Sequence, residues 1–282
     1  MAWLFLSVCL YAVNNVLWKL YVKGQHPLFI ISRRAIFTVA LAFAAAWITK
    51  TDLSKFIYHP NSLYVYLASL FGALGLVMMV SFLKEGNLVQ MAFYSLLGAG
   101  IAASYSFLFR EVAISPKAIV GSILIVLGYL IFCIHEHQKV KKGKILLKQH
   151  LLLISMTLAF SVSLLIQWES LKIFSSLAII CTQETVVLVV TTAGTLFLYP
   201  KKTSENSHQI NLKMALMALV IFSGIFAGTI GLKSADPFMA SVAGFTVPVL
   251  SAFAGGTVFQ EKLTIIHTTS LLLMIGGGIC ML

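Results

Sequence analysis

Long apolar runs separated by short polar gaps are the dominant pattern of the chain. A helix needs about 20 mostly apolar residues to cross the hydrocarbon layer of a bilayer, and ten runs approach that length. The predicted membrane-spanning helices are Trp3–Tyr21, Leu28–Ile48, Leu63–Lys84, Leu88–Phe109, Pro116–Ile134, His150–Trp168, Ser175–Tyr199, Leu212–Leu232, Pro237–Phe259 and Ile265–Leu282. Even the longest polar stretches between them, His135–Gln149 and Lys201–Asn211, are too short for a soluble domain.

The composition supports a membrane protein. Of the 282 residues, 59% are apolar and 10% are charged, and the mean hydropathy is +0.95. A soluble domain has about 45–50% apolar and about 25% charged residues. The sequence therefore predicts an all-α integral membrane protein with ten transmembrane helices.

Small residues recur inside the apolar runs, as in Gly224-x-x-x-Gly228, Gly98-Ala99-Gly100 and Gly276-Gly277-Gly278. Such residues allow helix backbones to approach closely in lipid. We therefore expect a tightly packed bundle.

The chain contains an internal repeat. Placing Glu111 on Glu261 requires a shift of 261 − 111 = 150 residues. The same shift superposes several landmarks without a gap: Gly98 on Pro248, Gly128 on Gly278, Trp18 on Trp168, and Arg33-Arg34 on Gln183-Glu184. We predict a first five-helix repeat over residues 1–134, a lysine-rich linker loop over 135–147, and a second five-helix repeat over 148–282.

Because five is an odd number, the second repeat must enter the membrane in the opposite sense to the first. Inverted repeats are typical of transporters, in which exchanging the conformations of the two halves converts an inward-open state into an outward-open one. The architecture therefore favours transport over a receptor or scaffold role.

Two blocks of sequence carry a family resemblance. The second block contains the run Ala240–Val249 with Pro248, then Gln260-Glu261-Lys262-Leu263-Thr264, then Gly276–Gly278. The first block is a weaker copy, with Gly98 in the position of the proline and Arg110-Glu111 in the position of the acidic turn. Together they resemble the EamA-type ten-helix branch of the drug/metabolite transporter superfamily. The resemblance implies a small-molecule transporter with both termini in the cytoplasm.

The sequence also departs from the family pattern. The family often has Gly-Glu where this chain has Arg110-Glu111 and Gln260-Glu261. The basic pair Arg33-Arg34 is replaced by Gln183-Glu184 in the second half. Because substrate choice follows such cavity residues, the resemblance carries over no specific substrate.

Glu184 is the sharpest candidate for a functional residue. It lies nine residues into its predicted helix, about 13 Å along the axis at about 1.5 Å per residue, and an ionisable group at such depth usually faces a cavity or a partner. One interpretation is that Glu184 binds a cationic or amine group or titrates with a coupling proton. The alternative is a structural hydrogen bond to Gln183, a threonine or a backbone group.

Arg33 and Arg34 lie about two turns into the second predicted helix. Either they reach toward the interface or one of them binds an anion. Lys19 and Glu169 occupy equivalent places in the two halves, so inversion puts them at opposite faces. We therefore hypothesise a positive mouth formed by Lys19, Arg33 and Arg34, and a negative mouth formed by Glu169 and Glu184.

Further residues within the apolar runs are cavity candidates: Asn14, Asn15, Tyr94, Gln167, Trp168 and Gln183. For Asn14, Asn15, Tyr94 and Gln167 the alternative is interhelical hydrogen bonding. Glu111 and Glu261 are interpreted as structural. Each precedes a predicted helix, and the free backbone N–H groups at the start of a helix can donate hydrogen bonds to a carboxylate. Gly98 and Pro248, at equivalent positions of the repeat, are also interpreted as structural.

The net charge of +11 comes from 20 Lys and Arg against 9 Asp and Glu. The basic residues lie mostly in short gaps between the apolar runs. This placement is typical of residues that set the topology in the membrane and contact anionic lipid, and it does not indicate a nucleic-acid surface. Their excess lies in gaps on the side opposite the termini, which favours external termini. The resemblance implies the reverse, so the orientation stays open.

The sequence predicts no metal and no cofactor. The four cysteines lie far apart without ligand spacing, and no nucleotide-binding or hydrolase signature is present. We therefore predict no enzyme activity, but a permease of the inner cell membrane that acts by alternating access as a monomer or homodimer. A small metabolite, such as an amino acid or related compound, is the expected substrate, with protons as a candidate coupling ion. The alternative is a lipid-handling protein or a non-transporting scaffold.

Overall fold

The computed structural model describes residues 2–109, 116–141, 147–198, 207–234, 244, 246–262 and 264–281. These residues form helices joined by turns, and none of the described residues lies in a strand. The helices are α1 (Ala2–Val22), α2 (Pro27–Ile48), α3 (Ser54–Ile57), α4 (Ser62–Leu83), α5 (Leu88–Phe109), α6 (Pro116–Lys141), α7 (Leu147–Ser170), α8 (Ser176–Leu198), α9 (Ser207–Ser234), α11 (Thr246–Val258) and α12 (Ile265–Met281).

Most predicted runs coincide with one long helix, and α5 has the predicted bounds. Three differences arise where polar residues are helical. The short helix α3 lies in the polar gap after α2, α6 continues to Lys141, and α9 begins at Ser207. Residues 135–141, expected in the linker loop, are therefore helical. Of the predicted Pro237–Phe259 helix, α11 is described, whereas residues 237–243 and 245 lie outside the description.

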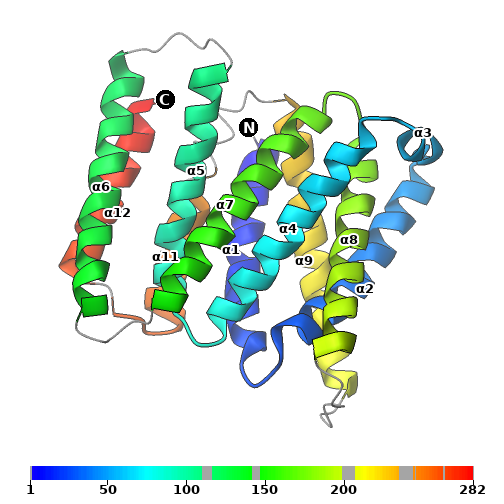
Figure 1. Cartoon of the computed structure of the whole chain (residues 1–282), viewed down its shortest axis with the longest axis horizontal. Helices are drawn as coiled ribbons and strands as arrows, with labels where there is room; N and C mark the ends of the chain where they lie inside the picture. Colours follow the sequence, from blue (N-terminus) through cyan, green and yellow to red (C-terminus); the bar gives the residue numbers. More distant parts are fainter. Residues whose placement is uncertain are drawn as a thin grey trace.

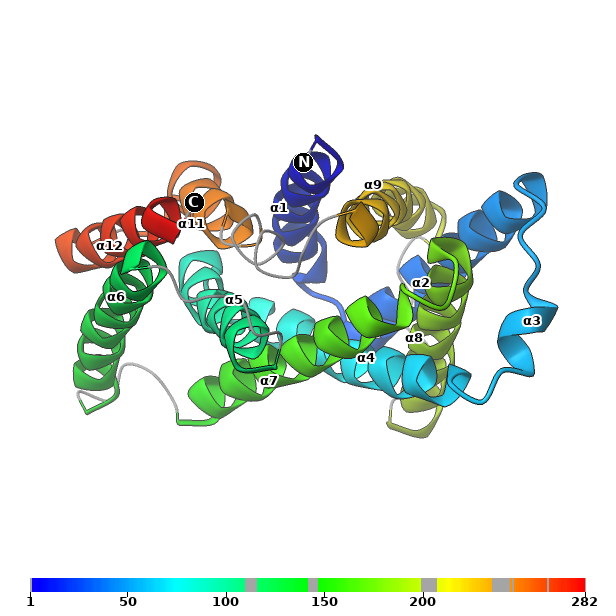
Figure 2. The ribbon, with the colours of Figure 1, turned by 90° about the horizontal axis from the view of Figure 1, so that it is seen from above.

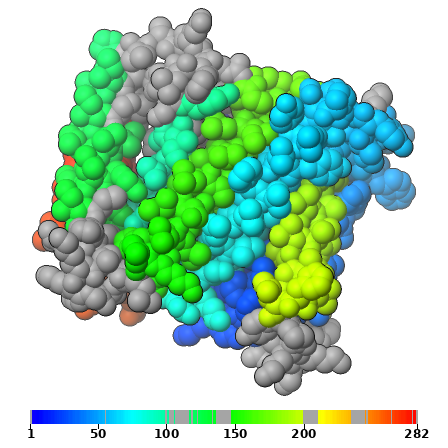
Figure 3. Space-filling model, in the orientation of Figure 1, coloured from blue at the N-terminus to red at the C-terminus, as the bar shows by residue number. Residues whose placement is uncertain are grey.

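The long helices form two layers. Viewed from above, α12, α11, α1 and α9 lie along one side, and α6, α5, α7 and α4 lie along the other (Figure 2). Contacts of α6 with α12 and of α5 with α11 join the two layers. The remaining long helices, α2 and α8, pack against each other, and they contact α9 and α4, respectively. Within the layers, α4 packs along α7 and α1 along α9, and Figure 3 shows α4 and α7 side by side on one face.

Both termini lie toward the same end of the bundle (Figure 1). We call this the terminal end, and the end that holds the α1–α2 and α4–α5 turns the opposite end. Among the described residues, six helices are long and apolar enough to cross a membrane: α1, α2, α4, α7, α8 and the Ile210–Lys233 part of α9. Large apolar side chains such as Phe5, Ile123 and Leu130 are exposed on the outside, as expected for surfaces in contact with lipid.

Glycines bring several helices into close contact. A Cβ added at Gly277 of α12 would lie 2.5 Å from the Gly121 carbonyl oxygen of α6. One added at Gly228 of α9 would lie 2.8 Å from the Ser7 hydroxyl of α1. Gly276, in contrast, has no such neighbour within 4 Å. Close packing thus depends on particular glycines of the small-residue runs.

Candidate functional site

A buried ion pair joins the two halves of the chain in the interior of the bundle. The Nη2 of Arg34 on α2 lies 2.9 Å from Oε2 of Glu184 on α8 and donates a hydrogen bond to it. Both residues are only 1% exposed. In such surroundings each charge depends on the other for compensation, because a lone charge without water is strongly unfavourable.

One face of α1 packs against this ion pair. The Arg34 guanidinium carbon lies 5.7 Å from the centre of the fully buried Trp18 ring. Tyr11 and Asn14 precede Trp18 by seven and four residues, so helical spacing places all three on the same face. Tyr11 interacts electrostatically with both Arg34 and Glu184. We call Trp18, Asn14, Arg34 and Glu184 the central polar site.

Three buried polar atoms of the central polar site have no hydrogen-bond partner among the described residues. They are Nε of Arg34, Nε1 of Trp18 and Oδ1 of Asn14. Since buried polar groups are nearly always satisfied, each unsatisfied group calls for an explanation. Two N–H donors and one acceptor of these residues therefore have no partner among the described residues.

Other polar side chains within the apolar runs pair between helices. Nε2 of Gln167 on α7 donates to Oε1 of Gln183 on α8 at 2.9 Å, and Nδ2 of Asn15 donates to the Ser251 hydroxyl of α11 at 3.0 Å. Tyr94 of α5 hydrogen-bonds through its hydroxyl to Nδ1 of His150 at the start of α7. These contacts match the interhelical alternative considered for each residue.

A second ion pair lies at the opposite end of the bundle. Nζ of Lys19 lies 2.5 Å from Oε1 of Glu261 and also donates to the Gly86 carbonyl oxygen at 2.8 Å. The Glu261 carboxylate accepts the backbone N–H groups of Leu88 and Val89, each at 2.9 Å. Glu261 thus caps α5, whereas the sequence suggested that it would cap its own following helix, α12. We call this arrangement the Lys19–Glu261 clamp.

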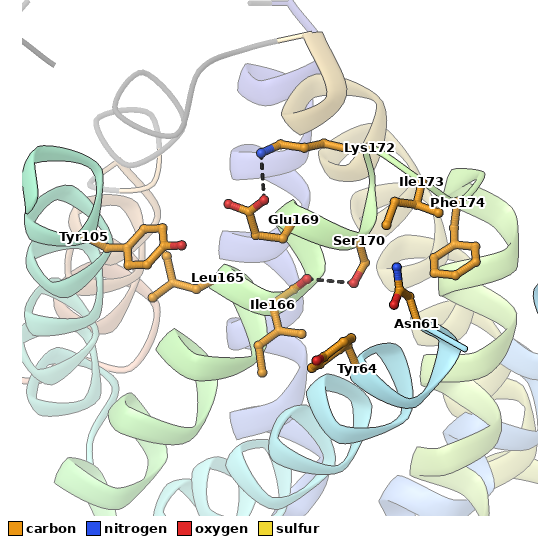
Figure 4. Close-up of a pocket in the computed structure, with 10 residues that line it drawn as sticks. All are labelled: Asn61, Tyr64, Tyr105, Leu165, Ile166, Glu169, Ser170, Lys172, Ile173 and Phe174. Atoms are coloured by element: carbon orange, nitrogen blue, oxygen red, sulfur yellow. Dashed lines mark hydrogen bonds and ion pairs between the residues drawn. The ribbon is translucent and has the colours of Figure 1, made fainter. Parts of the chain in front are cut away.

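A pocket of about 450 Å³ lies near the terminal end of the bundle. It lies between the start of α4, the end of α7 and Tyr105 of α5 (Figure 4). Its polar lining includes Asn61, Tyr64 and an exposed ion pair in which Lys172 donates to Glu169 at 2.7 Å. Lys172 also lies 4.0 Å from the centre of the Trp168 ring.

The hypothesis of one positive and one negative mouth is wrong. Arg34 and Glu184, assigned to opposite mouths, are in direct contact. Lys19 is neutralised by Glu261, and Glu169 by Lys172. The two less exposed pairs, Arg34–Glu184 and Lys19–Glu261, join distant parts of the chain, because pairing is the least costly way to keep opposite charges away from water.

The remaining candidates lie outside the central polar site. The Arg33 guanidinium lies 5.2 Å from the centre of the Phe29 ring. Gly98 faces Ser161 and Thr157 of α7, and Pro248 is buried in α11. Glu111 lies outside the described residues.

Sequence reasoning missed Trp18, Tyr11 and Ser251 as members of the polar interior. Trp18 served only as a landmark of the repeat. Residues 11, 14, 15 and 18 follow helical spacing and all carry hydrogen-bonding groups, which was the available signal. Ser251 gave no such signal, since a lone serine in an apolar run most often bonds to its own helix.

Comparison with known proteins gives a family match for the first half of the chain and a fold match for the whole of it. Residues 1–134 match the model of the EamA-like transporter family. A crystal structure of another protein shares the fold with a TM-score of 0.71 and 14% sequence identity, over 99% of this chain and 94% of that chain. Among curated proteins, none matches the sequence. At 14% identity the structural likeness shows the fold alone.

Proposed function

Residues 1–134 match the model of the EamA-like transporter family, and we propose that this multi-pass membrane protein belongs to that family, within the drug/metabolite transporter superfamily, and is a secondary transporter. It moves a small metabolite across the inner cell membrane by alternating access. Ten helices cross the membrane as two inverted five-helix repeats, with the central polar site between them.

The pattern of helix contacts is the observation that carries this proposal. The 150-residue shift relates α1 to α7, α2 to α8, α4 to α9, α5 to α11 and α6 to α12. Under this exchange the contact of α4 with α7 becomes that of α9 with α1, and the contact of α4 with α8 becomes that of α9 with α2. The contacts of α2 with α8, α5 with α11 and α6 with α12 transform into themselves. Two interchangeable halves are what alternating access requires.

The ion pair obeys the same relation. Arg34 and Glu184 are separated by 150 residues, so each is the repeat counterpart of the other. Equivalent positions of two halves meet only on the axis that relates them. The central polar site therefore lies where both halves can act on one bound molecule.

The two ends of the bundle differ in a way that suits one state of a transport cycle. The opposite end is held together by the Lys19–Glu261 clamp, whereas the terminal end has the pocket beside Glu169. We interpret this conformation as closed at the opposite end, with the pocket as a vestibule at the terminal end.

Lipid handling and a scaffold role are less well supported. A scaffold requires neither interchangeable halves nor a charged interior. The inward-facing charges also favour a polar solute over a lipid chain, because apolar cargo gains nothing from a buried ion pair. Proton coupling through Glu184, and a monomeric or homodimeric state, remain part of the proposal.

Reconstituted transport tests the proposal. The purified full chain is placed in proteoliposomes loaded with an unlabelled metabolite, and uptake of the same labelled metabolite is followed. The panel comprises amino acids, organic anions, organic amines and nucleosides. Saturable counterflow of at least one compound, absent from protein-free vesicles, is expected. Absence of counterflow across the whole panel would contradict the proposed function.

A further inference from the structure

The pocket beside Glu169 shares a helix face with residues that are exposed on the outside of the bundle. Leu158 and Val162 of α7 are 49% and 38% exposed, and Leu165 and Glu169 follow them at helical spacing, so the four residues lie on one face of α7. Leu165 and Glu169 line the pocket, as does Tyr64 of α4, which is 57% exposed. One side of the pocket is therefore turned toward the bilayer.

The pocket also lies at the depth where apolar residues give way to polar ones. The apolar helix α4 begins at Ser62 and α7 ends at Ser170, and the pocket lining extends past both limits, to Asn61 and Lys172. Tryptophan and tyrosine are enriched at this level of a membrane, and the Trp168 ring lies 4.0 Å from Nζ of Lys172. The pocket therefore has an apolar part at the level of the acyl chains and a polar rim at the level of the lipid headgroups.

The polar rim carries one charge of each sign. Nζ of Lys172 donates to Oε2 of Glu169 at 2.7 Å, and the two side chains are 45% and 38% exposed. Figure 4 shows this ion pair above the apolar side chains of Leu165 and Ile166. Because an exposed ion pair contributes little to stability, each partner can turn to a ligand group at small cost. A ligand that fits this pocket has an anionic and a cationic group close together and an apolar chain.

We propose that the pocket binds a phospholipid with a phosphoethanolamine headgroup. The phosphate accepts a hydrogen bond from Lys172, the ammonium group donates to the Glu169 carboxylate, and an acyl chain lies against Leu165 and Ile166. A lipid held in this way seals the bilayer side of the pocket. The inference goes beyond the proposed transport function and does not depend on it.

Charge balance and hydrogen bonding select this headgroup over two alternatives. Phosphatidylglycerol has the phosphate but no cationic group, so it would place an added negative charge beside Glu169. Phosphatidylcholine has no net charge, like phosphatidylethanolamine, but its quaternary ammonium group has no N–H to donate. Hydrogen bonds that involve a charged group are roughly twice as strong as neutral ones. The loss of these donors should therefore weaken binding.

Native mass spectrometry of the purified full chain in detergent measures the binding. Phosphatidylethanolamine, phosphatidylcholine and phosphatidylglycerol with identical acyl chains are added in turn, and free phosphoethanolamine supplies the headgroup without the chains. We expect phosphatidylethanolamine to bind about 5- to 10-fold more tightly than the other two lipids, the effect of about one charged contact at a membrane surface. Free phosphoethanolamine should bind at least about 10-fold more weakly than the lipid, because it has no acyl chain to bury.

A double variant assigns this preference to the pocket. Glu169→Leu/Lys172→Met removes both charges of the rim and keeps the apolar wall, and size-exclusion chromatography verifies that the variant is folded. We expect it to bind the three lipids with equal affinity. The control Lys117→Met removes an exposed cation at the start of α6 and should keep the preference for phosphatidylethanolamine.

Three outcomes overturn the inference. The first is that phosphatidylglycerol or phosphatidylcholine binds as tightly as phosphatidylethanolamine, as expected if lipids respond only to the net positive charge of the chain or to its apolar surface. The second is that the folded double variant keeps the preference. The third is that free phosphoethanolamine binds as tightly as the lipid, which would make the pocket a site for a water-soluble ligand. None of these outcomes changes the counterflow result, so failure of this inference is distinguishable from failure of the proposed transport function.

Discussion

At the residue scale, the Arg34–Glu184 ion pair sets a test of stability that is independent of transport. Each side chain is buried and relies on the other for compensation. Removing one partner from a buried pair typically costs about 3–5 kcal/mol, whereas replacing both with apolar residues is often neutral or stabilising. We therefore expect Arg34→Met alone and Glu184→Leu alone to unfold at clearly lower temperature than Arg34→Met/Glu184→Leu in detergent.

The measurement is a double-mutant cycle on the midpoint of thermal unfolding. A strong coupling between the two substitutions is the expected result. If the effects of the two single substitutions simply add in the double variant, the side chains do not compensate each other in the folded protein.

His26, in the turn between α1 and α2, gives a prediction about pH. Burial, and secondarily the charge of Lys84, lower the pKa of His26 below its usual 6.5. The unfolded chain therefore takes up a proton at higher pH than the folded protein does, and the free energy of unfolding decreases as the pH falls below about 6.5. We expect the unfolding temperature of His26→Gln to fall less between pH 7.5 and pH 5.5 than that of the wild type.

Lys84→Met serves as the companion variant. It removes the repulsion between the Lys84 ammonium group and the protonated imidazole of His26, and it should raise the pKa of His26 partway toward 6.5. Its pH dependence should lie between those of the other two proteins. An identical decrease in all three would exclude His26 as a source of the acid sensitivity.

At the element scale, the contact between α6 and α12 depends on one glycine. A Cβ at Gly277 would lie 2.5 Å from the Gly121 carbonyl oxygen and 2.8 Å from Cγ1 of Ile125. Because the nearest atom is backbone, the helices must separate to admit a methyl group. We expect Gly277→Ala to destabilise the protein by about 1–3 kcal/mol, the usual cost of overpacking, measured by thermal or denaturant unfolding.

Gly276→Ala is the matched control for this prediction. It lies on the same helix, one residue earlier, with no such neighbour within 4 Å. Alanine also has a higher helix propensity than glycine, by about 1 kcal/mol. The control should therefore be neutral or more stable, and equal destabilisation by both substitutions would contradict the proposed close contact.

The helices themselves could be predicted well from the sequence, because an apolar run about 20 residues long has few alternatives in a bilayer. Run ends were harder to predict. Residues 135–141 are mostly polar yet helical in α6, since a helix can continue into polar residues beyond an apolar run. The short α3 lies in a polar gap, where periodicity gives no signal.

The central polar site could be predicted only in part. Burial of Glu184 follows from its depth in an apolar run, but its partner lies 150 residues away. Contacts between distant helices depend on how those helices pack, which a single sequence does not reveal. The repeat carried a usable signal, because residues near the symmetry axis meet their own counterparts, and Arg34 and Glu184 are counterparts of opposite charge.

For Glu261 the role was predicted but the partner was not. A capping role was expected, but the helix that Glu261 caps, α5, belongs to the other half.

At the scale of the whole molecule, the Lys19–Glu261 clamp joins α1, the α4–α5 turn, the start of α5 and the α11–α12 turn at the opposite end. Lys19 also lies 5.3 Å from the centre of the Phe259 ring. Contacts that exist in only one of two conformations shift the equilibrium between them. Lys19→Met removes the charged donor and should therefore favour the state that is open at the opposite end.

Accessibility of a cysteine measures this shift. Leu88 is fully buried beside the clamp, so Leu88→Cys, in a background with the four native cysteines replaced by serine, should react slowly with a membrane-impermeant maleimide. Adding Lys19→Met should raise the labelling rate by about 5- to 30-fold. This range corresponds to the loss of about 1–2 kcal/mol by which a partly buried ion pair stabilises the closed state. Lys23→Met, which removes an exposed lysine four residues further on, should leave the rate unchanged. Equal labelling of Leu88→Cys with and without Lys19→Met would mean that the clamp does not hold this end closed, and that the closed state depends on helix packing alone.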